Sequence, residues 1–274
     1  MIGICTDSNS QLPASLAQRY GIEVVPLTVT VDGAEYMEGI DLDADAFYAK
    51  YTDGHRPAVS TSQPSPGQFA VAYDDLLARG CTEILSIHVS GAPSGPLNAA
   101  RLAAHSLPTP GRLVDSGTAS FGISCCVWAA AAAIADGATL DQAAQIAEQL
   151  APSIGNVFVV GALDHLHAGG RGTGLAHGDD LAMLTLRDGN VEVVERLASA
   201  LDAVNAMASY AIGWGTTVRV AVGHSDAATQ PLADGLEAAV GEAASVIDVV
   251  RYRVGPSVGA HTGPGTVGCF VFPA

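Results

Sequence analysis

The chain has 274 residues, of which 49% are hydrophobic, and its 28 acidic residues against 12 basic ones give a net charge of −16. This composition predicts a sizeable buried core, and the negative charge argues against nucleic acid or an anionic membrane surface as a partner. Lys50 is the single lysine. Walker A loops, protein kinases and Schiff-base enzymes each need a placed lysine, so we do not expect this chain to transfer phosphate from a nucleotide by itself.

Short apolar runs alternate with longer helical segments in the first half of the chain, which is typical of an α/β protein with a largely parallel sheet. Strands are expected at residues 2–5, 24–31, 84–89 and 112–114. Helices are expected at residues 14–20, 44–51, 68–79, 97–107, 120–136 and 140–150.

The pattern of expected strands and helices changes after Pro152. Strands are expected at residues 156–163, 181–186, 191–197, 218–224, 246–254 and 266–272, and helices at 200–212 and 230–243. The second and third of these strands flank Asp188-Gly189-Asn190, a hairpin signal that predicts antiparallel pairing. We therefore expect two α/β domains, residues 1–152 and 153–274, with a ligand crevice between them.

The segment Thr61-Ser62-Gln63-Pro64-Ser65-Pro66-Gly67 packs three hydroxyls and two prolines just before a predicted helix. Such a loop can form an anion cradle, since the hydroxyls, the remaining N–H groups and the helix dipole converge on one acceptor. The alternative is an ordinary turn and helix cap. Similar hydroxyl-rich loops follow other strands, at Thr6-Asp7-Ser8, at residues 90–95 and at Asp115-Ser116-Gly117, where α/β proteins bind ligands; capping also accounts for Asp7, Ser8 and Ser116.

Three other motifs carry less weight. Gly255-Pro256-Ser257-Val258-Gly259 matches the nucleophile elbow of serine hydrolases, but we expect no helix after Ser257, and too little chain remains for the acid and the histidine. His165 and His167 would share one face of a strand, yet nothing nearby supplies further metal ligands, so we expect no metal site. The glycines at 169–174 lack the dinucleotide-binding spacing.

The cysteines and the N-terminus bear on location. The five cysteines show neither a C-x-x-C pair nor metal-ligand spacing, and their odd number argues against a disulfide framework, so we expect small buried side chains. The chain begins with a strand-like run without a signal sequence, and its longest apolar run, residues 123–135, is too short to span a bilayer. The sequence therefore predicts a cytoplasmic protein without stable membrane insertion.

Several segments, in this order, resemble the DegV family of bacterial lipid-binding proteins, which includes the fatty-acid-binding subunit of the two-component fatty acid kinase. They are Thr6-Asp7-Ser8, Tyr20-Gly21-Ile22 with Val25-Pro26-Leu27, Thr61 to Gly67, Ile87-His88-Val89-Ser90 with Ser94-Gly95, Asp115-Ser116, Gly169-Gly170-Arg171, and Gly259-Ala260-His261-Thr262-Gly263-Pro264-Gly265. The resemblance extends over nearly the whole chain.

This resemblance implies a two-domain α/β protein that buries one long-chain fatty acid in a tunnel and presents its carboxylate to a separate ATP-dependent kinase. It implies no cofactor and no catalytic residue in this chain. Thr61, Ser62 and Ser90 correspond to head-group contacts, and Ser94 and Gly95 continue that loop. Arg171 and His261, with Thr262 and Gly263, correspond to residues near the tunnel mouth.

The sequence departs from the family pattern at Gly91, Pro96 and Gly172, where a second serine, a threonine and a branched apolar residue are common. A second hypothesis therefore stands beside the fatty-acid carrier: an α/β enzyme, a hydrolase or a transferase, that acts on a small anionic substrate. The single lysine and the lack of a complete acid–base or metal constellation in the sequence favour the carrier.

Overall fold

The computed structural model describes residues 1–52, 55–89, 95–161, 181–187 and 189–274. By its internal packing the chain divides into two compact units. Unit 1 comprises Met1–Val29, Glu35–Ile40 and Thr61–Ser153, and unit 2 comprises Thr30–Ala34, Asp41–Ser60 and Ile154–Ala274. The expected domain boundary between residues 152 and 153 stays a prediction.

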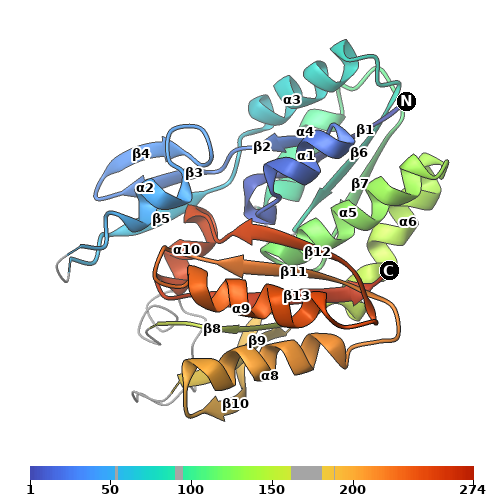
Figure 1. The fold of residues 1–274 in the computed structure, drawn as a ribbon. Coiled ribbons are helices and arrows are strands. Elements are labelled where there is room, and N and C mark those ends of the chain that lie inside the picture. Colours follow the sequence, from blue (N-terminus) through green and yellow to red (C-terminus); the bar gives the residue numbers. More distant parts are fainter. Residues whose placement is uncertain (53–54, 90–94, 162–180, 188) are drawn as a thin grey trace. The chain divides into compact units, whose positions relative to one another are not determined.

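Unit 1 is built on a four-stranded sheet of order β2-β1-β6-β7, in which every neighbouring pair is parallel. The strands are β1 (Ile2–Asp7), β2 (Glu23–Val25), β6 (Glu83–His88) and β7 (Gly111–Asp115). Helices α3 (Pro66–Ala78) and α4 (Pro96–Ala104) pack together against one face of this sheet, and α5 (Phe121–Ala135) and α6 (Leu140–Leu150) against the other, beside α1 (Ala14–Tyr20) (Figure 1). The largely parallel architecture expected for the first half is confirmed.

The unit 1 sheet is covered on both faces, which accounts for its nearly continuous apolar strands. Ile84, Leu85 and Ile87 of β6 are fully buried. Helix α5 is likewise apolar on most of its surface, and its side chains from Phe121 to Trp128 are all buried. Four of the polar side chains that unit 1 buries, Thr6, Asp7, His88 and Ser116, lie at the carboxyl ends of its strands.

Unit 2 contains a six-stranded sheet of order β10-β9-β8-β13-β11-β12. Its strands are β8 (Gly155–Val159), β9 (Leu181–Arg187), β10 (Asn190–Leu197), β11 (Val218–His224), β12 (Val246–Arg253) and β13 (Val267–Pro273). The pair β11–β12 is parallel and the other pairs are antiparallel, including the β9–β10 hairpin, so the expected antiparallel pairing is confirmed.

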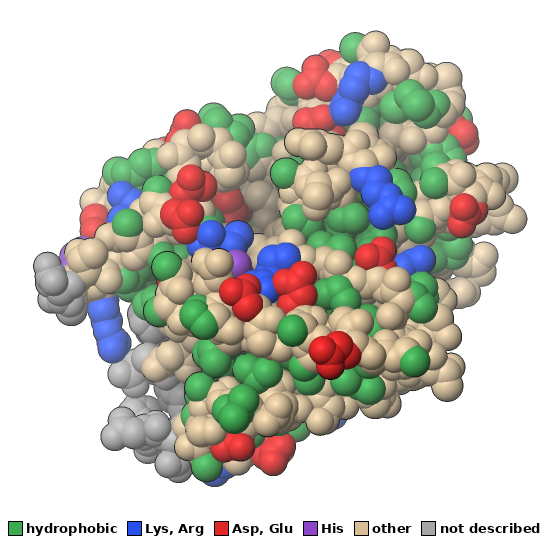
Figure 2. Space-filling model, viewed as in Figure 1, with side chains coloured by type: hydrophobic (Ala, Val, Ile, Leu, Met, Phe, Trp, Pro, Cys, Tyr) green, Lys and Arg blue, Asp and Glu red, His purple; other side chains and the backbone are tan. Residues whose placement is uncertain are grey.

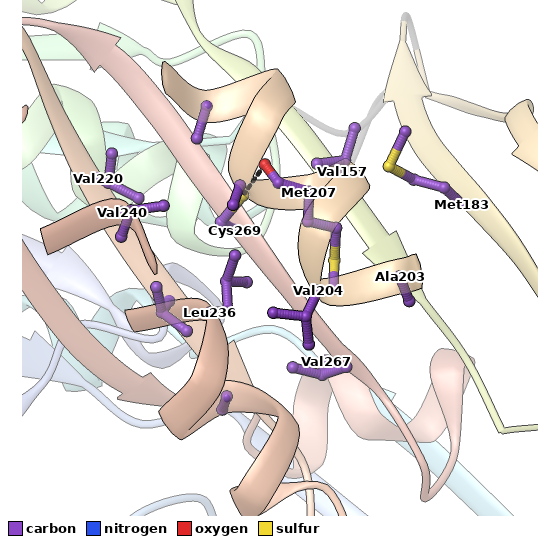
Figure 3. Packing of buried hydrophobic residues seen from close by; sticks show 14 of the residues in the cluster. Val157, Met183, Ala203, Val204, Met207, Val220, Leu236, Val240, Val267 and Cys269 are labelled. Atoms are coloured by element: carbon purple, nitrogen blue, oxygen red, sulfur yellow. Dashed lines mark hydrogen bonds between the residues drawn. The ribbon is translucent and has the colours of Figure 1, made fainter. Parts of the chain in front are cut away.

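Helices α8 (Ala200–Ile212) and α9 (Gln230–Gly241) cover one face of the unit 2 sheet. Figure 3 shows their side chains, among them Met207 and Leu236, packed against Val220, Val267 and Cys269 of the strands. Over α9 and β12, acidic and basic side chains lie together on the surface (Figure 2), where Arg251 pairs with two carboxylates of α9.

A third sheet, of order β4-β3-β5, joins β3 (Thr28–Val31), β4 (Ala34–Met37) and β5 (Val59–Ser62). The single strand expected at residues 24–31 is wrong. Pro26 has no N–H to donate to a ladder, the N–H of Leu27 instead donates to the Ser8 hydroxyl at 2.9 Å, and the chain passes from one sheet to another between β2 and β3. Strands β4 and β5 were not expected because three of the four β4 residues and both serines of β5 are exposed, which hides the strand signal.

Two further α-helices are α2 (Ala44–Tyr48) and α10 (Pro256–Thr262), and two short 3₁₀ helices lie at Ser8–Ser10 and Ala151–Ser153. The expectation that no helix follows Ser257 is wrong, because α10 begins at Pro256 and continues through Ser257 to Thr262. Pro256 occupies the first helical position, where its missing N–H costs nothing. Among the helices of the described residues, none is long and apolar enough to cross a membrane.

Candidate functional site

Polar side chains are buried where the parallel strands β1, β6 and β7 of unit 1 end. Thr6, Asp7, His88 and Ser116 are each inaccessible to solvent. Residues two apart on a strand share a face, so Ser86 and His88 of β6 point to the face that α3 covers. Buried polar groups are tolerated only where they are hydrogen-bonded, and these four side chains with Ser86 all have partners.

A continuous hydrogen-bonded chain runs through Asp7, His88, Ser86 and Tyr73. The Asp7 Oδ2 atom lies 2.6 Å from His88 Nδ1, His88 Nε2 lies 2.7 Å from Ser86 Oγ, and Ser86 Oγ lies 2.9 Å from the Tyr73 hydroxyl. The second Asp7 oxygen accepts the N–H of Asn9 at 3.0 Å. Burial raises the pKa of the Tyr73 hydroxyl, so this end of the chain stays protonated. We call these four residues the buried relay.

The buried relay has the order of groups found in serine hydrolases, in which a carboxylate orients a histidine that contacts a serine. Its serine, however, is 1% exposed and also holds the Tyr73 hydroxyl. A nucleophile must reach its substrate, and the elbow of a hydrolase exposes it at the top of a sharp turn, whereas Ser86 lies within a strand. The geometry therefore supports a structural use of these groups rather than attack by Ser86.

This constellation was not expected from the sequence. Its signal is present, because Asp7 ends one strand and Ser86-x-His88 ends another. Alternation along β6 places the serine and the histidine on one face, but only the parallel pairing of β1 with β6, in which Cys5 lies opposite Ser86, brings Asp7 to the histidine.

The hydroxyl-rich segment divides between a strand and a helix cap. Thr61 and Ser62 belong to β5, so the expectation of one continuous loop is wrong, and of the two Thr61 is half-buried and Ser62 exposed. Ser65 caps α3: its hydroxyl accepts the N–H of Gln68, and the Gln68 side chain accepts the N–H of Ser65 in return. The capping interpretation is thus confirmed for Ser65, while the anion cradle at Thr61 and Ser62 stays a prediction.

Capping was also the alternative for three residues of the other loops. Asp7 does cap a short helical turn, since it accepts the N–H of Asn9. Ser8 does not: its hydroxyl donates to the buried Glu38 carboxylate and accepts from Leu27, which ties β1 to the segment after β2. The Ser116 hydroxyl donates to the Thr118 carbonyl within its own turn.

Of the remaining predicted ligand-binding residues, Ser90, Ser94 and Arg171 lie outside the described residues, as do His165 and His167. Gly95 is described and begins α4 as its N-cap residue. All of these predicted contacts stay predictions.

His261, Thr262 and Gly263 lie at the end of α10 in unit 2. His261 and Thr262 are half-buried, and the carbonyls of Thr262 and Gly263 accept the Thr266 hydroxyl at 3.5 and 3.0 Å. Gly263 has φ 71° and ψ −175°, a conformation open to glycine alone. These hydrogen bonds hold the glycine-rich turn against the start of β13.

Helix α10 packs closely on α2. A Cβ atom at Gly259 would lie 2.5 Å from the Tyr48 hydroxyl oxygen and 2.8 Å from a Phe47 ring carbon, so any larger residue would push the two helices apart. Ser257 of the elbow-like motif is 1% exposed. Because the motif's serine is buried, burial rather than the lack of a following helix argues against a hydrolase.

A second polar cluster lies where β11 and β12 end. Arg253 donates to the Asp45 carboxylate and to the Ser225 carbonyl, both at 2.7 Å, and it lowers the pKa of Asp45. His224 is the register partner of Arg253. Burial, with the nearby guanidinium groups of Arg253 and Arg251, lowers the pKa of His224, so the imidazole is neutral at pH 7. No group of three or more potential metal ligands occurs among the described residues.

The comparisons with known proteins place this geometry in a family. The model described as "uncharacterised protein, DegV family" matches residues 1–274. The chain belongs to the DegV family. A DegV domain-containing protein of Streptomyces coelicolor is 36% identical over 280 aligned residues that cover 98% of both chains.

Solved structures of the family share the fold. The structure described as fatty acid binding of a DegV family protein from Thermus thermophilus is 30% identical and superimposes with a TM-score of 0.84, covering 100% of this chain and 99% of that one. A stearic acid-binding protein from Eubacterium ventriosum, 21% identical, superimposes with a TM-score of 0.83 over 100% of this chain and 98% of its own. At that lower identity the likeness concerns the fold alone.

Proposed function

We propose that this chain binds one long-chain fatty acid in a buried apolar tunnel and holds the carboxylate with hydroxyl groups. The observation that carries the proposal is the full-length similarity, at 30% identity, to the Thermus thermophilus protein described as fatty acid binding. The chemistry of the chain agrees, since a hydrophobic interior is combined with hydroxyl-bearing segments after several strands.

The acyl chain would supply most of the affinity. Burying about 14 methylene groups at roughly 0.8 kcal/mol each amounts to about 11 kcal/mol before the costs of association and ordering. An exposed groove of that size would promote aggregation, so a closed tunnel is the expected form. The charged head group must be met by hydrogen-bond donors, because burying a carboxylate without donors costs more free energy than burial of the tail contributes.

We assign the carboxylate to Thr61, Ser62 and Ser90, with Ser94 and Gly95 completing the second hydroxyl loop. Thr61 is supported by its position, half-buried on β5 and four residues before the Ser65 cap of α3. Short hydroxyl donors suit a ligand that must later react at its carboxylate, because a bidentate arginine would hold that group too firmly.

We further propose that the bound acid is phosphorylated by a separate ATP-dependent kinase and that this chain contributes no catalytic residue. The single lysine supports this division. Arg171, His261, Thr262 and Gly263 are assigned to the mouth of the tunnel, where they would face the kinase and the acyl phosphate that it forms.

Mass spectrometry of the natively purified protein tests the proposal. Protein denatured in organic solvent should release long-chain fatty acid at close to one molecule per chain. An extract that contained only a polar metabolite would contradict it. ATP hydrolysis or acyl phosphate formation by the isolated chain would contradict the second proposal and leave the first intact.

The alternative function is that of an α/β enzyme acting on a small anionic substrate. The buried relay contains the groups of a hydrolase site, but Ser86 is 1% exposed, so the carrier is the better supported function and the enzyme stays the alternative. The two functions separate in one assay: hydrolysis of short-chain p-nitrophenyl esters that is abolished by Ser86→Ala would favour the enzyme, whereas the carrier predicts no turnover above that of the variant.

A further inference from the structure

The polar side chains of the buried relay cost more free energy to bury than apolar side chains at the same positions would. Asp7 and His88 are both fully buried, and burying polar or charged groups costs free energy that apolar side chains of similar volume would not. Unit 1 already has apolar cores on both faces of its sheet. We therefore look for a role of Asp7 and His88 other than stabilising the fold. Their hydrogen bonds indicate such a role, because they fix the orientation of the imidazole at both of its nitrogen atoms.

The ring of His88 is held in a single orientation. An ionised Asp7 accepts the proton of Nδ1, which leaves Nε2 to accept the Ser86 hydroxyl, and Tyr73 then donates to Ser86. The Tyr73 hydroxyl also lies 3.4 Å from the Ala100 carbonyl, which is a second and more distant acceptor. Phe69 adds a third contact to the imidazole, since its ring meets it edge-on with 5.0 Å between ring centroids.

These contacts join the elements that carry the predicted head-group residues. Phe69 lies in the first turn of α3, directly after the segment that contains Thr61 and Ser65. The His88 carbonyl accepts the N–H of Ser116 at 2.8 Å, which fixes the end of β6 to the turn after β7. The imidazole thus joins the start of α3, through Phe69, to the ends of β1 and β6, through Asp7 and Ser86.

We propose that His88, clamped by Asp7 and Ser86, is a positioning residue for carboxylate recognition: it sets where the chain enters α3 and thereby where the hydroxyl of Thr61 lies. This inference rests on the proposed function, and the ligand it concerns is a long-chain carboxylate. Replacing a positioning residue should weaken the binding of the charged head group and leave the binding of the acyl tail unchanged. A residue that serves only the fold should affect both.

Two ligands of equal tail length separate these roles. We would titrate delipidated protein with hexadecanoate and with 1-hexadecanol by calorimetry and compare the ratio of the two affinities. His88→Leu should weaken hexadecanoate binding by about tenfold or more, the effect of losing one donor to a charged group, and change 1-hexadecanol binding by less than about threefold. His88→Asn, which keeps an N–H for Asp7, should restore much of the ratio.

Two variants guard against a folding artefact. Ser86→Ala leaves the Asp7–His88 bond in place and should lower the ratio less than His88→Leu does, which gives a result even if the leucine variant does not fold. Ser124→Ala removes a buried hydroxyl of the same unit, which donates to the Ser10 carbonyl at 2.7 Å outside the buried relay, and should leave the ratio unchanged.

Three outcomes would overturn the inference. Equal losses for the acid and the alcohol in His88→Leu or Ser86→Ala would assign the buried relay to the fold alone. An unchanged ratio in every folded variant would remove His88 from recognition. Failure of the delipidated wild type to bind hexadecanoate would instead defeat the proposed function itself, and the inference with it.

Discussion

Asp7 and His88 lie 81 residues apart in the sequence, yet their side chains form a 2.6 Å hydrogen bond that is fully shielded from solvent. The bond connects the ends of two neighbouring parallel strands, β1 and β6, at the edge where α/β proteins place their ligands. It therefore couples the stability of unit 1 to the region that we assign to the carboxylate.

Asp7→Asn should lower the free energy of unfolding by about 1 to 3 kcal/mol, because an amide cannot replace the two hydrogen bonds that the carboxylate accepts from the His88 imidazole and the Asn9 N–H. Urea unfolding at pH 7 measures the change. Asp43→Asn is the matched control: Asp43 caps α2 at the surface, and asparagine caps as well as aspartate, so the cost should stay below about 0.5 kcal/mol. Equal effects of the two substitutions would contradict a special contribution of the Asp7–His88 pair.

Thr61→Ala should weaken fatty-acid binding by roughly 1 to 3 kcal/mol, since a charged acceptor would lack one donor. Calorimetric titration of delipidated protein gives the difference. Ser65→Ala serves as the comparison, because its hydroxyl is engaged in the capping box of α3: it should cost about 1 kcal/mol of stability and leave the affinity nearly unchanged. If both variants bound as tightly as the wild type, the carboxylate would lie elsewhere.

Arg171→Ala and His261→Ala should change fatty-acid affinity by less than about threefold, under 1 kcal/mol, if hydroxyls already satisfy the carboxylate. Their effect should appear when a partner kinase phosphorylates the bound acid, because the added phosphoryl charge forms in the field of a protein with a net charge of −16. Binding is followed by calorimetry and acyl phosphate formation by trapping with hydroxylamine. Loss of binding in a folded Arg171→Ala variant would make Arg171 the primary carboxylate ligand.

His224 should make the fold sensitive to acid. Burial and the guanidinium groups of Arg253 and Arg251 lower its pKa in the folded state below the ordinary value of 6.5. Unfolded chains then bind the proton first, so stability is fully present above about pH 6.5 and falls as the pH drops toward the folded pKa. His224→Gln should lose less stability than the wild type between pH 7 and pH 5, as measured by urea midpoints. The exposed His105→Gln should behave like the wild type, and identical pH profiles for all three proteins would refute the prediction.

The five cysteines should be inert in the native protein. All are buried and unpaired, and burial raises the pKa of the Cys126 and Cys269 thiols to about 12, so thiolate is scarce at pH 8. Ellman's reagent should react slowly with native protein and reveal five thiols per chain in guanidinium chloride. Rapid reaction of one native thiol would mean that its surroundings open readily.

Local sequence patterns predict much of the architecture. The helices Ala14–Tyr20, Leu140–Leu150 and Ala200–Ile212 and the strand Val218–His224 begin and end where the sequence predicts. In each, an apolar period of about 3.6 residues or a short apolar run is bounded by capping or turn residues, and these signals act within a few positions. The motifs that resemble the DegV family can likewise be identified from the sequence without the structure.

Other features depended on partners distant in the sequence. Strand β5 has a polar, half-exposed sequence and is a strand only because β3 pairs with it, and the break at Pro26 follows from two strands joining different sheets. Likewise, Asp7 alone predicts a cap, and Ser86 and His88 alone predict a strand. Only the parallel pairing of β1 and β6 beneath α3 brings the carboxylate within 2.6 Å of the imidazole, because local propensity sets which elements form while tertiary packing decides which side chains meet.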